Sequence, residues 1–264
     1  MPVNKVARFV YLVRMSISKR LIPALAAVVL AACSSQPPYQ GMGAADLYDL
    51  ALRQYQAGEY QDAIRALDRL FVAYGGWEQM SEARLLMGHA YFAKEEYLTA
   101  QSEYQRFVDR YPAHPEASNA ALGICRSLSA LSPNPHRDQT YTEEAITVCR
   151  NVVLDYAGTP ASLEAGGIAN AMRLKLAEKE YLNADFYFRR EMYDSAIKYF
   201  EFVVDLYPET EWAPRALLGI YRANTAIGYD DLADDARRRL VQDYPDSVEA
   251  QSVRTEGESG AVTG

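Results

Sequence analysis

In this 264-residue chain an alanine recurs eleven residues before a tyrosine, and five such pairs follow one another at intervals of 37 to 51 residues. The five pairs are Ala63–Tyr74, Ala100–Tyr111, Ala145–Tyr156, Ala196–Tyr207 and Ala233–Tyr244. A proline follows three of these tyrosines directly, at Pro112, Pro208 and Pro245. Because an offset that recurs along a chain is typical of repeat architectures, the sequence predicts five stacked units whose neighbours bury a shared core.

The second unit indicates the kind of repeat. It has the TPR spacing of apolar residue, glycine, aromatic, alanine, aromatic and proline, at Met87, Gly88, Tyr91, Ala100, Tyr104 and Pro112. Gly88 and Ala100 are expected where two antiparallel helices approach most closely, and Pro112 stops the second helix because it has no N–H to donate. We therefore expect an all-α fold, a right-handed superhelix of five TPR-type helix hairpins.

Two units are longer than a TPR. The marker alanines are 37, 45, 51 and 37 residues apart, against about 34 for a TPR unit. In the third unit, the breaker-rich stretch 132–141 predicts a loop between the two helices. In the fourth, Thr159 and Pro160 have the residue types of a helix start, and the helical pattern continues to about Arg190. An added or lengthened helix is thus expected between repeats 3 and 4.

The expected organisation follows from these boundaries. Residues 45–158 would form repeats 1–3, and residues 159–246 the linking helix with repeats 4–5. Residues 247–264 are rich in Ser, Gly, Glu and Thr, which predicts a disordered tail.

The first 32 residues predict a signal peptide. They contain five basic residues and no acidic one, and they end in a short apolar run, Leu21 to Ala32. Residues 15–32 alone would also make a complete signal, so either Met1 or Met15 could be the start. The ending Leu30-Ala31-Ala32-Cys33 resembles the lipobox of bacterial lipoproteins, which implies lipidation of Cys33. Residues 33–44 would be the lipidated N-terminus and a tether, attached to the outer membrane by acyl chains and facing the periplasm.

Charge and motifs exclude several classes of function. The net charge of −8 becomes −13 once the five basic residues of the signal are removed, so nucleic-acid binding is not expected. The three histidines, His89, His114 and His136, lack metal-ligand spacing, and the sequence has no P-loop, GxGxxG or GxSxG motif. We expect no metal, no cofactor and no enzymatic activity.

The inner wall of a TPR superhelix suggests a binding surface. Its exposed positions lie on the first helix of each repeat, and in repeats 1 and 2 they are mainly aromatic or apolar: Tyr48, Leu52, Tyr55, Leu85, His89 and Phe92. Such a wall suits an apolar or aromatic peptide segment. The alternative is that the tether or a neighbouring helix covers these side chains.

Two further sets of residues leave alternatives open. Cys125 and Cys149 lie at similar distances on either side of the middle of the loop in the third repeat, so a disulfide and two buried thiols are equally compatible with the sequence. Arg189 and Arg190 stand near a helix C-terminus, where the dipole favours them without any partner contact.

Three segments in the interrupted repeats carry a family resemblance. They are His136-Arg137-Asp138-Gln139-Thr140, Leu176-Ala177-Glu178-Lys179-Glu180 and Phe186-Tyr187-Phe188-Arg189-Arg190-Glu191-Met192-Tyr193. With them the chain resembles the BamD family of the β-barrel assembly machinery. The resemblance implies a lipoprotein scaffold that binds unfolded outer-membrane β-barrel precursors, the insertase BamA and other assembly lipoproteins.

The same resemblance implies partner contacts near the fourth repeat, through Arg189, Arg190 and Lys198. The chain departs from the resemblance at one position, because family members often have an arginine two residues beyond Ile197 and this chain has Tyr199. The runner-up function is a TPR pilotin lipoprotein that supports a secretin or a pilus, and an activator of a peptidoglycan enzyme is a third alternative.

Overall fold

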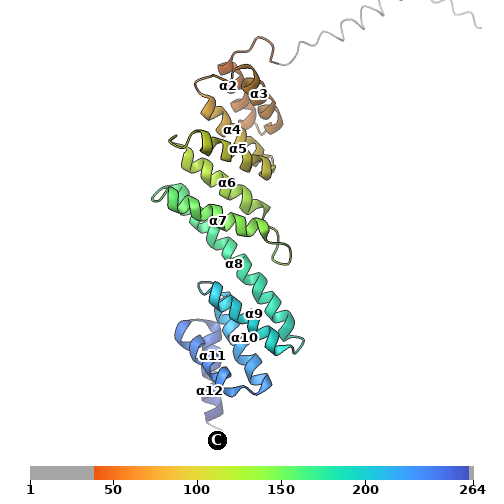
Figure 1. The fold of residues 1–264 in the computed structure, drawn as a ribbon, viewed down its shortest axis with the longest axis vertical. Helices are drawn as coiled ribbons and strands as arrows, with labels where there is room; N and C mark the ends of the chain where they lie inside the picture. Colours follow the sequence, from red (N-terminus) through yellow and green to blue (C-terminus); the bar gives the residue numbers. More distant parts are fainter. Residues whose placement is uncertain (1–38, 262–264) are drawn as a thin grey trace, which may run out of the picture. The chain divides into compact units, whose positions relative to one another are not determined.

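The computed structural model describes residues 39–261, and in that range every regular element is an α-helix (Figure 1). The helices pair in chain order, and each packs on the next. Their bounds are α2 Ala44–Gln56, α3 Tyr60–Ala73, α4 Met80–Ala93, α5 Tyr97–Arg110, α6 Ala117–Leu131, α7 Thr140–Asp155, α8 Pro160–Phe188, α9 Tyr193–Leu206, α10 Trp212–Ile227, α11 Asp230–Asp243 and α12 Val248–Ala261. The predicted all-α fold of helix hairpins is confirmed.

The expected signal peptide, the lipidated Cys33 and most of the tether lie outside the described residues. Among the helices within 39–261, none combines the length and the apolar character needed to cross a lipid bilayer.

The recurring alanine and tyrosine have separate structural roles. All five marker alanines lie on the second helix of a hairpin and are at most 5% exposed. All five tyrosines are the C-cap of that same helix, and each donates its backbone N–H to the carbonyl four residues earlier. The eleven-residue offset therefore measures the distance from the helix–helix contact to the helix end.

The glycines of the repeat accommodate aromatic rings. The ring of Tyr104 on α5 lies between Gly88 of α4 and Gly123 of α6, and a Cβ added to either glycine would stand 2.7 Å from a ring carbon. Phe200 of α9 meets Gly219 of α10 in the same way, at 2.6 Å. Gly88 is thus small because an aromatic side chain fills the space between adjacent helices, not because two backbones meet there.

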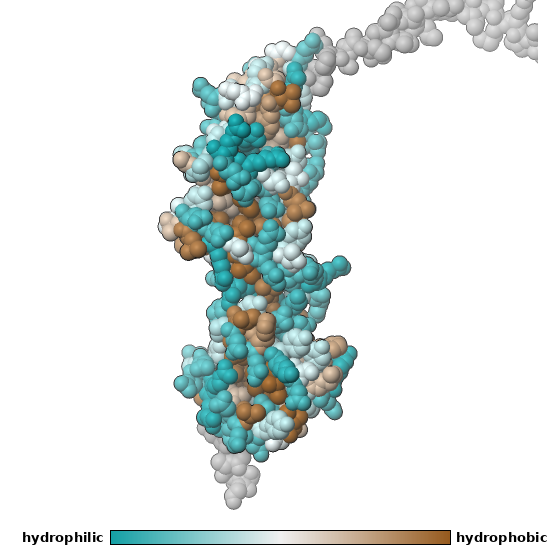
Figure 2. Space-filling model, viewed as in Figure 1, coloured by the Kyte–Doolittle hydropathy of each residue, from teal (hydrophilic) through white to brown (hydrophobic). Residues whose placement is uncertain are grey.

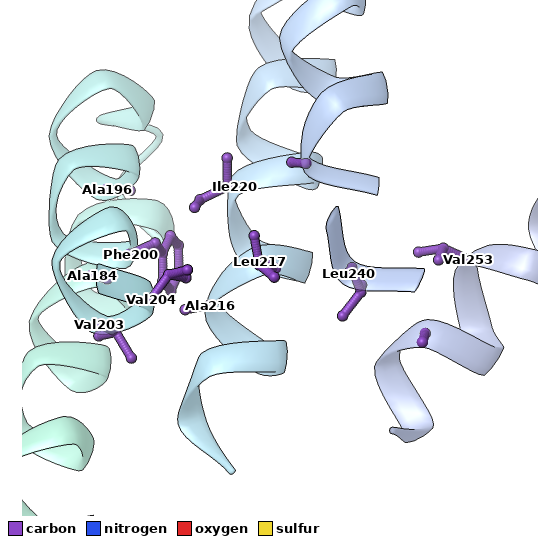
Figure 3. Packing of buried hydrophobic residues seen from close by; sticks show 12 residues of the cluster. Ala184, Ala196, Phe200, Val203, Val204, Ala216, Leu217, Ile220, Leu240 and Val253 are labelled. Carbon is purple, nitrogen blue, oxygen red and sulfur yellow. The ribbon is translucent and has the colours of Figure 1, made fainter. Parts of the chain in front are cut away.

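The hydrophobic core of the last two hairpins shows how neighbouring units share side chains. Figure 3 shows Phe200, Val203 and Val204 of α9 facing Leu217 and Ile220 of α10. The same cluster continues through Leu240 of α11 to Val253 of α12. Each helix buries one side against its predecessor and another against its successor, as expected for a repeat array.

The extra residues of the fourth repeat form one long helix. α8 runs over 29 residues, and its N-cap Thr159 accepts a hydrogen bond from the backbone N–H of Ser162 at 3.1 Å. It packs against α6 and α7, and also against α9 and α10. Of the two alternatives, an added or a lengthened helix, the structure has the lengthened one.

The loop expected in the third repeat is present, between α6 and α7, and a buried side chain organises it. Gln139 is 2% exposed and donates to the backbone carbonyls of Asn134 and Arg137, at 2.8 and 3.0 Å. Lys175 of α8 donates to the hydroxyl of Ser132 at 2.7 Å. The insertion is therefore tied to the long helix.

The expectation of a disordered tail is wrong for residues 248–261, which form α12. Ser247 begins this helix, and its hydroxyl accepts from the backbone N–H of Ala250 at 3.1 Å. Ala250 and Val253 are at most 1% exposed and pack into the cluster of Figure 3. Burying these two side chains stabilises a segment whose composition alone suggested disorder.

Candidate functional site

The six wall residues of repeats 1 and 2 lie on the first helices of their hairpins, as predicted, three on α2 and three on α4. All six are half-buried rather than fully exposed: Tyr48, Leu52, Tyr55, Leu85, His89 and Phe92. Neighbouring aromatic rings account for part of this burial. Tyr48 lies 5.4 Å from Trp77, and Phe92 lies 5.3 Å from Tyr97, between ring centroids.

Tyr55 and His89 bring the two hairpins together at the middle of this wall. Their ring centroids are 6.5 Å apart, and Tyr55 also lies 5.6 Å from Tyr60. Nδ1 of His89 forms a 2.8 Å hydrogen bond with the hydroxyl of Tyr104. The wall is therefore a row of partly exposed rings supported from beneath by Tyr104.

The electrostatics keep the centre of the wall uncharged. Burial lowers the pKa of His89, and the nearby Arg126 lowers it further. Burial has the opposite effect on the Tyr104 hydroxyl, whose pKa it raises, because in both residues burial disfavours the charged form. Both groups are therefore neutral at pH 7, which suits contact with an apolar or aromatic segment.

A second candidate site, which the sequence analysis missed, lies in repeats 4 and 5. A pocket of about 220 Å³ there has aromatic and charged lining from α8, α9, α10 and α12: Tyr181, Asp185, Phe188, Phe200, Arg215, Leu218, Gly219, Arg222 and Glu249. The repeat spacing of the sequence contained a signal for this pocket. The wall residues of repeats 1 and 2 stand 15, 11 and 8 residues before the marker alanine. Counted back from Ala196 and Ala233, the same offsets select Thr225 and five residues of this pocket: Tyr181, Asp185, Phe188, Leu218 and Arg222.

The charges around this second pocket are largely paired. Arg215 contacts Glu211 at 2.7 Å and Glu249 at 3.6 Å, and its guanidinium carbon lies 4.6 Å from the Trp212 ring centroid. The Tyr181 ring lies 4.9 Å from that of Trp212, and burial raises the pKa of Tyr181. The pocket thus combines aromatic walls with charged side chains, and neither sign dominates.

Arg189, Arg190 and Lys198 are exposed around the junction of α8 and α9. Arg189 pairs with Asp185 at 2.9 Å, and the Arg190 guanidinium lies 3.6 Å from the Phe186 ring centroid. Close by, Tyr199 stacks on Tyr187 with a centroid distance of 5.2 Å and an interplanar angle of 8°. Both arginines therefore have local partners, and Tyr199 contributes an aromatic surface.

Cys125 and Cys149 form a disulfide in the structure, so the first of the two alternatives holds. The bond joins α6 to α7, and both side chains are fully buried. Its place is within a cluster of small apolar residues, among them Ala121, Val152 and Ala165. Within residues 39–261, no group of three or more potential metal-ligating side chains comes together.

Comparison with known proteins identifies the family to which this helical array is similar. The model of a family described as YfiO, outer membrane lipoprotein, matches residues 40–240. A relative from Caulobacter vibrioides, named outer membrane protein assembly factor BamD, is 27% identical over 204 residues, which are 75% of this chain and 65% of the relative. The chain thus spans just under two thirds of that relative.

A relative with the same name from Vibrio cholerae is 26% identical over 234 residues, covering 84% of this chain and 96% of the relative. Among solved structures, the TPR2AB domain of yeast Sti1 in complex with an HSP90 peptide is similar, with 15% identity, a TM-score of 0.42, and coverage of 78% and 80% of the two chains. Because the family model extends over well more than half of its residues, the chain belongs to the YfiO family of outer membrane lipoproteins.

Proposed function

We propose that this protein is an outer-membrane protein assembly factor of the BamD type, a scaffold that acts without catalysis. The observation that carries the proposal is the family match, which extends from residue 40 to residue 240, over four repeats and most of the fifth. Two relatives that bear the name of such a factor support it. Scaffolding also suits a helical array whose candidate sites are aromatic walls rather than clusters of catalytic groups.

The aromatic walls would hold segments of unfolded β-barrel precursors. Such a segment is extended, and alternate side chains that will face lipid are apolar or aromatic. Tyr55 and Phe92 present partly exposed rings on adjacent hairpins. Rings of this kind gain contact area with little loss of rotamer freedom, which favours binding of varied apolar segments.

Partner proteins would bind at the other half of the array. We place the BamA-type insertase near the junction of α8 and α9, where Arg189, Arg190 and Lys198 are exposed. The test is a pull-down of the tagged full chain in mild detergent. Copurification of the insertase, and of other assembly lipoproteins, is the expected result, whereas recovery of a secretin would favour the pilotin alternative.

Acylation of Cys33 would hold the protein at the periplasmic face of the outer membrane. A Cys33→Ala variant is expected to leave the membrane fraction, or to keep its signal peptide, because the Cys33 thiol is the proposed site of acylation. Flotation of outer membranes after a high-salt wash, followed by mass measurement of the protein, checks this. The anchor assignment fails if the variant still floats with the membranes as wild type does.

Truncation of the wall should weaken binding of precursor segments. Tyr55→Ala and Phe92→Ala are each expected to lower the affinity for a labelled, aromatic-rich β-strand peptide about tenfold, in the range of interface hot spots. Fluorescence titration measures the affinity, and thermal melts run alongside because both side chains are half-buried.

Tyr229→Ala is the matched control, since Tyr229 is a 53% exposed tyrosine outside the wall. It should bind the peptide as wild type does. A lowered melting temperature with unchanged affinity for Tyr55→Ala and Phe92→Ala would show that these rings belong to the core and do not bind peptide.

A further inference from the structure

A basic cleft lies on the second hairpin, where the start of α4 meets the end of α5. Its volume is about 480 Å³, and three arginines and one aspartate line it: Arg84, Arg106, Arg110 and Asp109. Strongly hydrophilic side chains gather over α4 and α5 on the face shown in Figure 2. The cleft is therefore locally basic although the net charge of the chain is −8.

An aromatic ring holds Arg84 in place at this cleft. Its guanidinium carbon lies 5.0 Å from the ring centroid of Phe71, at the end of α3. Its Nε is buried, and within the described part of the chain this nitrogen has no hydrogen-bond partner. A buried N–H donor without a partner is costly, and contacts within the described residues therefore leave the Arg84 guanidinium unsaturated.

The remaining lining residues leave donors available. Arg106 contacts Glu103 at 2.6 Å through one nitrogen, yet its side chain is 64% exposed. Asp109 accepts a 2.8 Å hydrogen bond from Gln105, which engages one of its oxygens. Arg110 forms no ion pair with any residue of the described range, and its position in the last turn of α5 is itself favoured by the helix dipole. Each guanidinium has five N–H donors, so these local contacts leave most of them free.

We propose that this cleft binds a phosphate group, and specifically the phosphate of a phospholipid headgroup. Two or three guanidinium groups around one anion match the tetrahedral oxygens of a phosphate through bidentate hydrogen bonds. Because the chain is acidic as a whole, it has no general attraction to anionic membranes. Binding must therefore come from this local cluster.

Two observations favour a lipid headgroup over free phosphate. Val72, next to the Phe71 that supports Arg84, is 81% exposed, and an apolar side chain beside basic residues is typical of surfaces that touch a membrane interface. Membership in a family of outer membrane lipoproteins would also keep headgroups close to the cleft at high effective concentration. Headgroup binding would orient the N-terminal hairpins relative to the membrane.

The test titrates the full lipidated chain, in micelles of a nonionic detergent, with three probes. These are inorganic phosphate, dihexanoyl phosphatidylglycerol, and dihexanoylglycerol, which lacks the phosphate. Calorimetry should detect binding of both phosphate-bearing probes and none of dihexanoylglycerol. Arg84→Gln and Arg110→Gln are each expected to lower the affinity for both about tenfold, as for loss of a charged hydrogen bond.

Arg65→Gln is the matched control, because it removes one positive charge from neighbouring α3 at an exposed ion pair with Asp62. The Arg65→Gln variant should bind both probes as wild type does. If it loses as much affinity as the cleft variants, the effect comes from the overall charge of the protein, and the proposed site is overturned. Binding of dihexanoylglycerol would overturn the phosphate assignment. Binding of inorganic phosphate alone would overturn the lipid assignment. Since Arg110 is exposed, its variant stays informative if Arg84→Gln fails to fold.

Discussion

Gly123→Val is expected to lower the free energy of unfolding by about 3 kcal/mol, the upper range for overpacking a core. A Cβ at Gly123 would stand 2.7 Å from the ring of Tyr104, and Gly88 faces the opposite side of that ring at the same distance. The ring therefore cannot move away from the new side chain without approaching α4. Chemical denaturation followed by circular dichroism measures the change.

Gly167→Val is the matched control. Gly167 also lies within a helix, α8, but a Cβ there has nothing within 4 Å. Because valine has a slightly better helix propensity than glycine, we expect a change within about 0.5 kcal/mol. Combining Gly123→Val with Tyr104→Leu should restore part of the lost stability, since the shorter side chain leaves room. Equal stability of the Gly123 and Gly167 variants would contradict the packing described here.

The repeat spacing predicted the fold well because it records two physical constraints at once. The alanine must be small where helices pack, and the chain must leave the helix eleven residues later, at a C-cap tyrosine. Thr159 and Pro160 predicted the start of α8 for an equally local reason, since the N-cap and the first helical position have strong residue preferences. Local signals of this kind can be read without knowledge of the tertiary structure.

Features that depend on distant residues were harder to predict. The tail seemed disordered by composition, yet Ala250 and Val253 pack into a cluster built by α9, α10 and α11. The wall of repeats 1 and 2 was expected to be exposed, but Trp77 and Tyr97, from outside the wall, cover part of it. In both cases, partners elsewhere in the chain decide how much of a side chain meets solvent.

The candidate pocket of repeats 4 and 5 was within reach of the sequence. Counting the same offsets back from the fourth and fifth marker alanines selects five of its lining residues. What the sequence could not provide was the contribution of Glu249, since α12 was not expected at all. The basic cleft was hidden for a similar reason, because Phe71, which supports Arg84, belongs to a different hairpin.

Removing the disulfide is expected to cost about 3 kcal/mol of stability. The bond joins residues 24 positions apart, and closing a loop of this size restricts the unfolded chain by about that amount of free energy. For a protein of this size the loss corresponds to a melting temperature lower by about 6–12 °C. Cys125→Ala with Cys149→Ala removes the bond without leaving a buried thiol or hydroxyl, and reduced wild type tests it without changing any side chain.

Both forms should melt below the oxidised wild type, and by similar amounts, because the constraint on the unfolded chain is the same in each. The α6–α7 hairpin carries the inserted loop and packs against the long helix α8. Its loosening should therefore appear as faster hydrogen exchange in α6, α7 and the first turns of α8, while α9–α11 keep their protection. If mass measurement confirms reduction and the melting temperature still does not fall, the bond contributes nothing to stability, and packing of the surrounding alanines and valines alone holds α6 against α7.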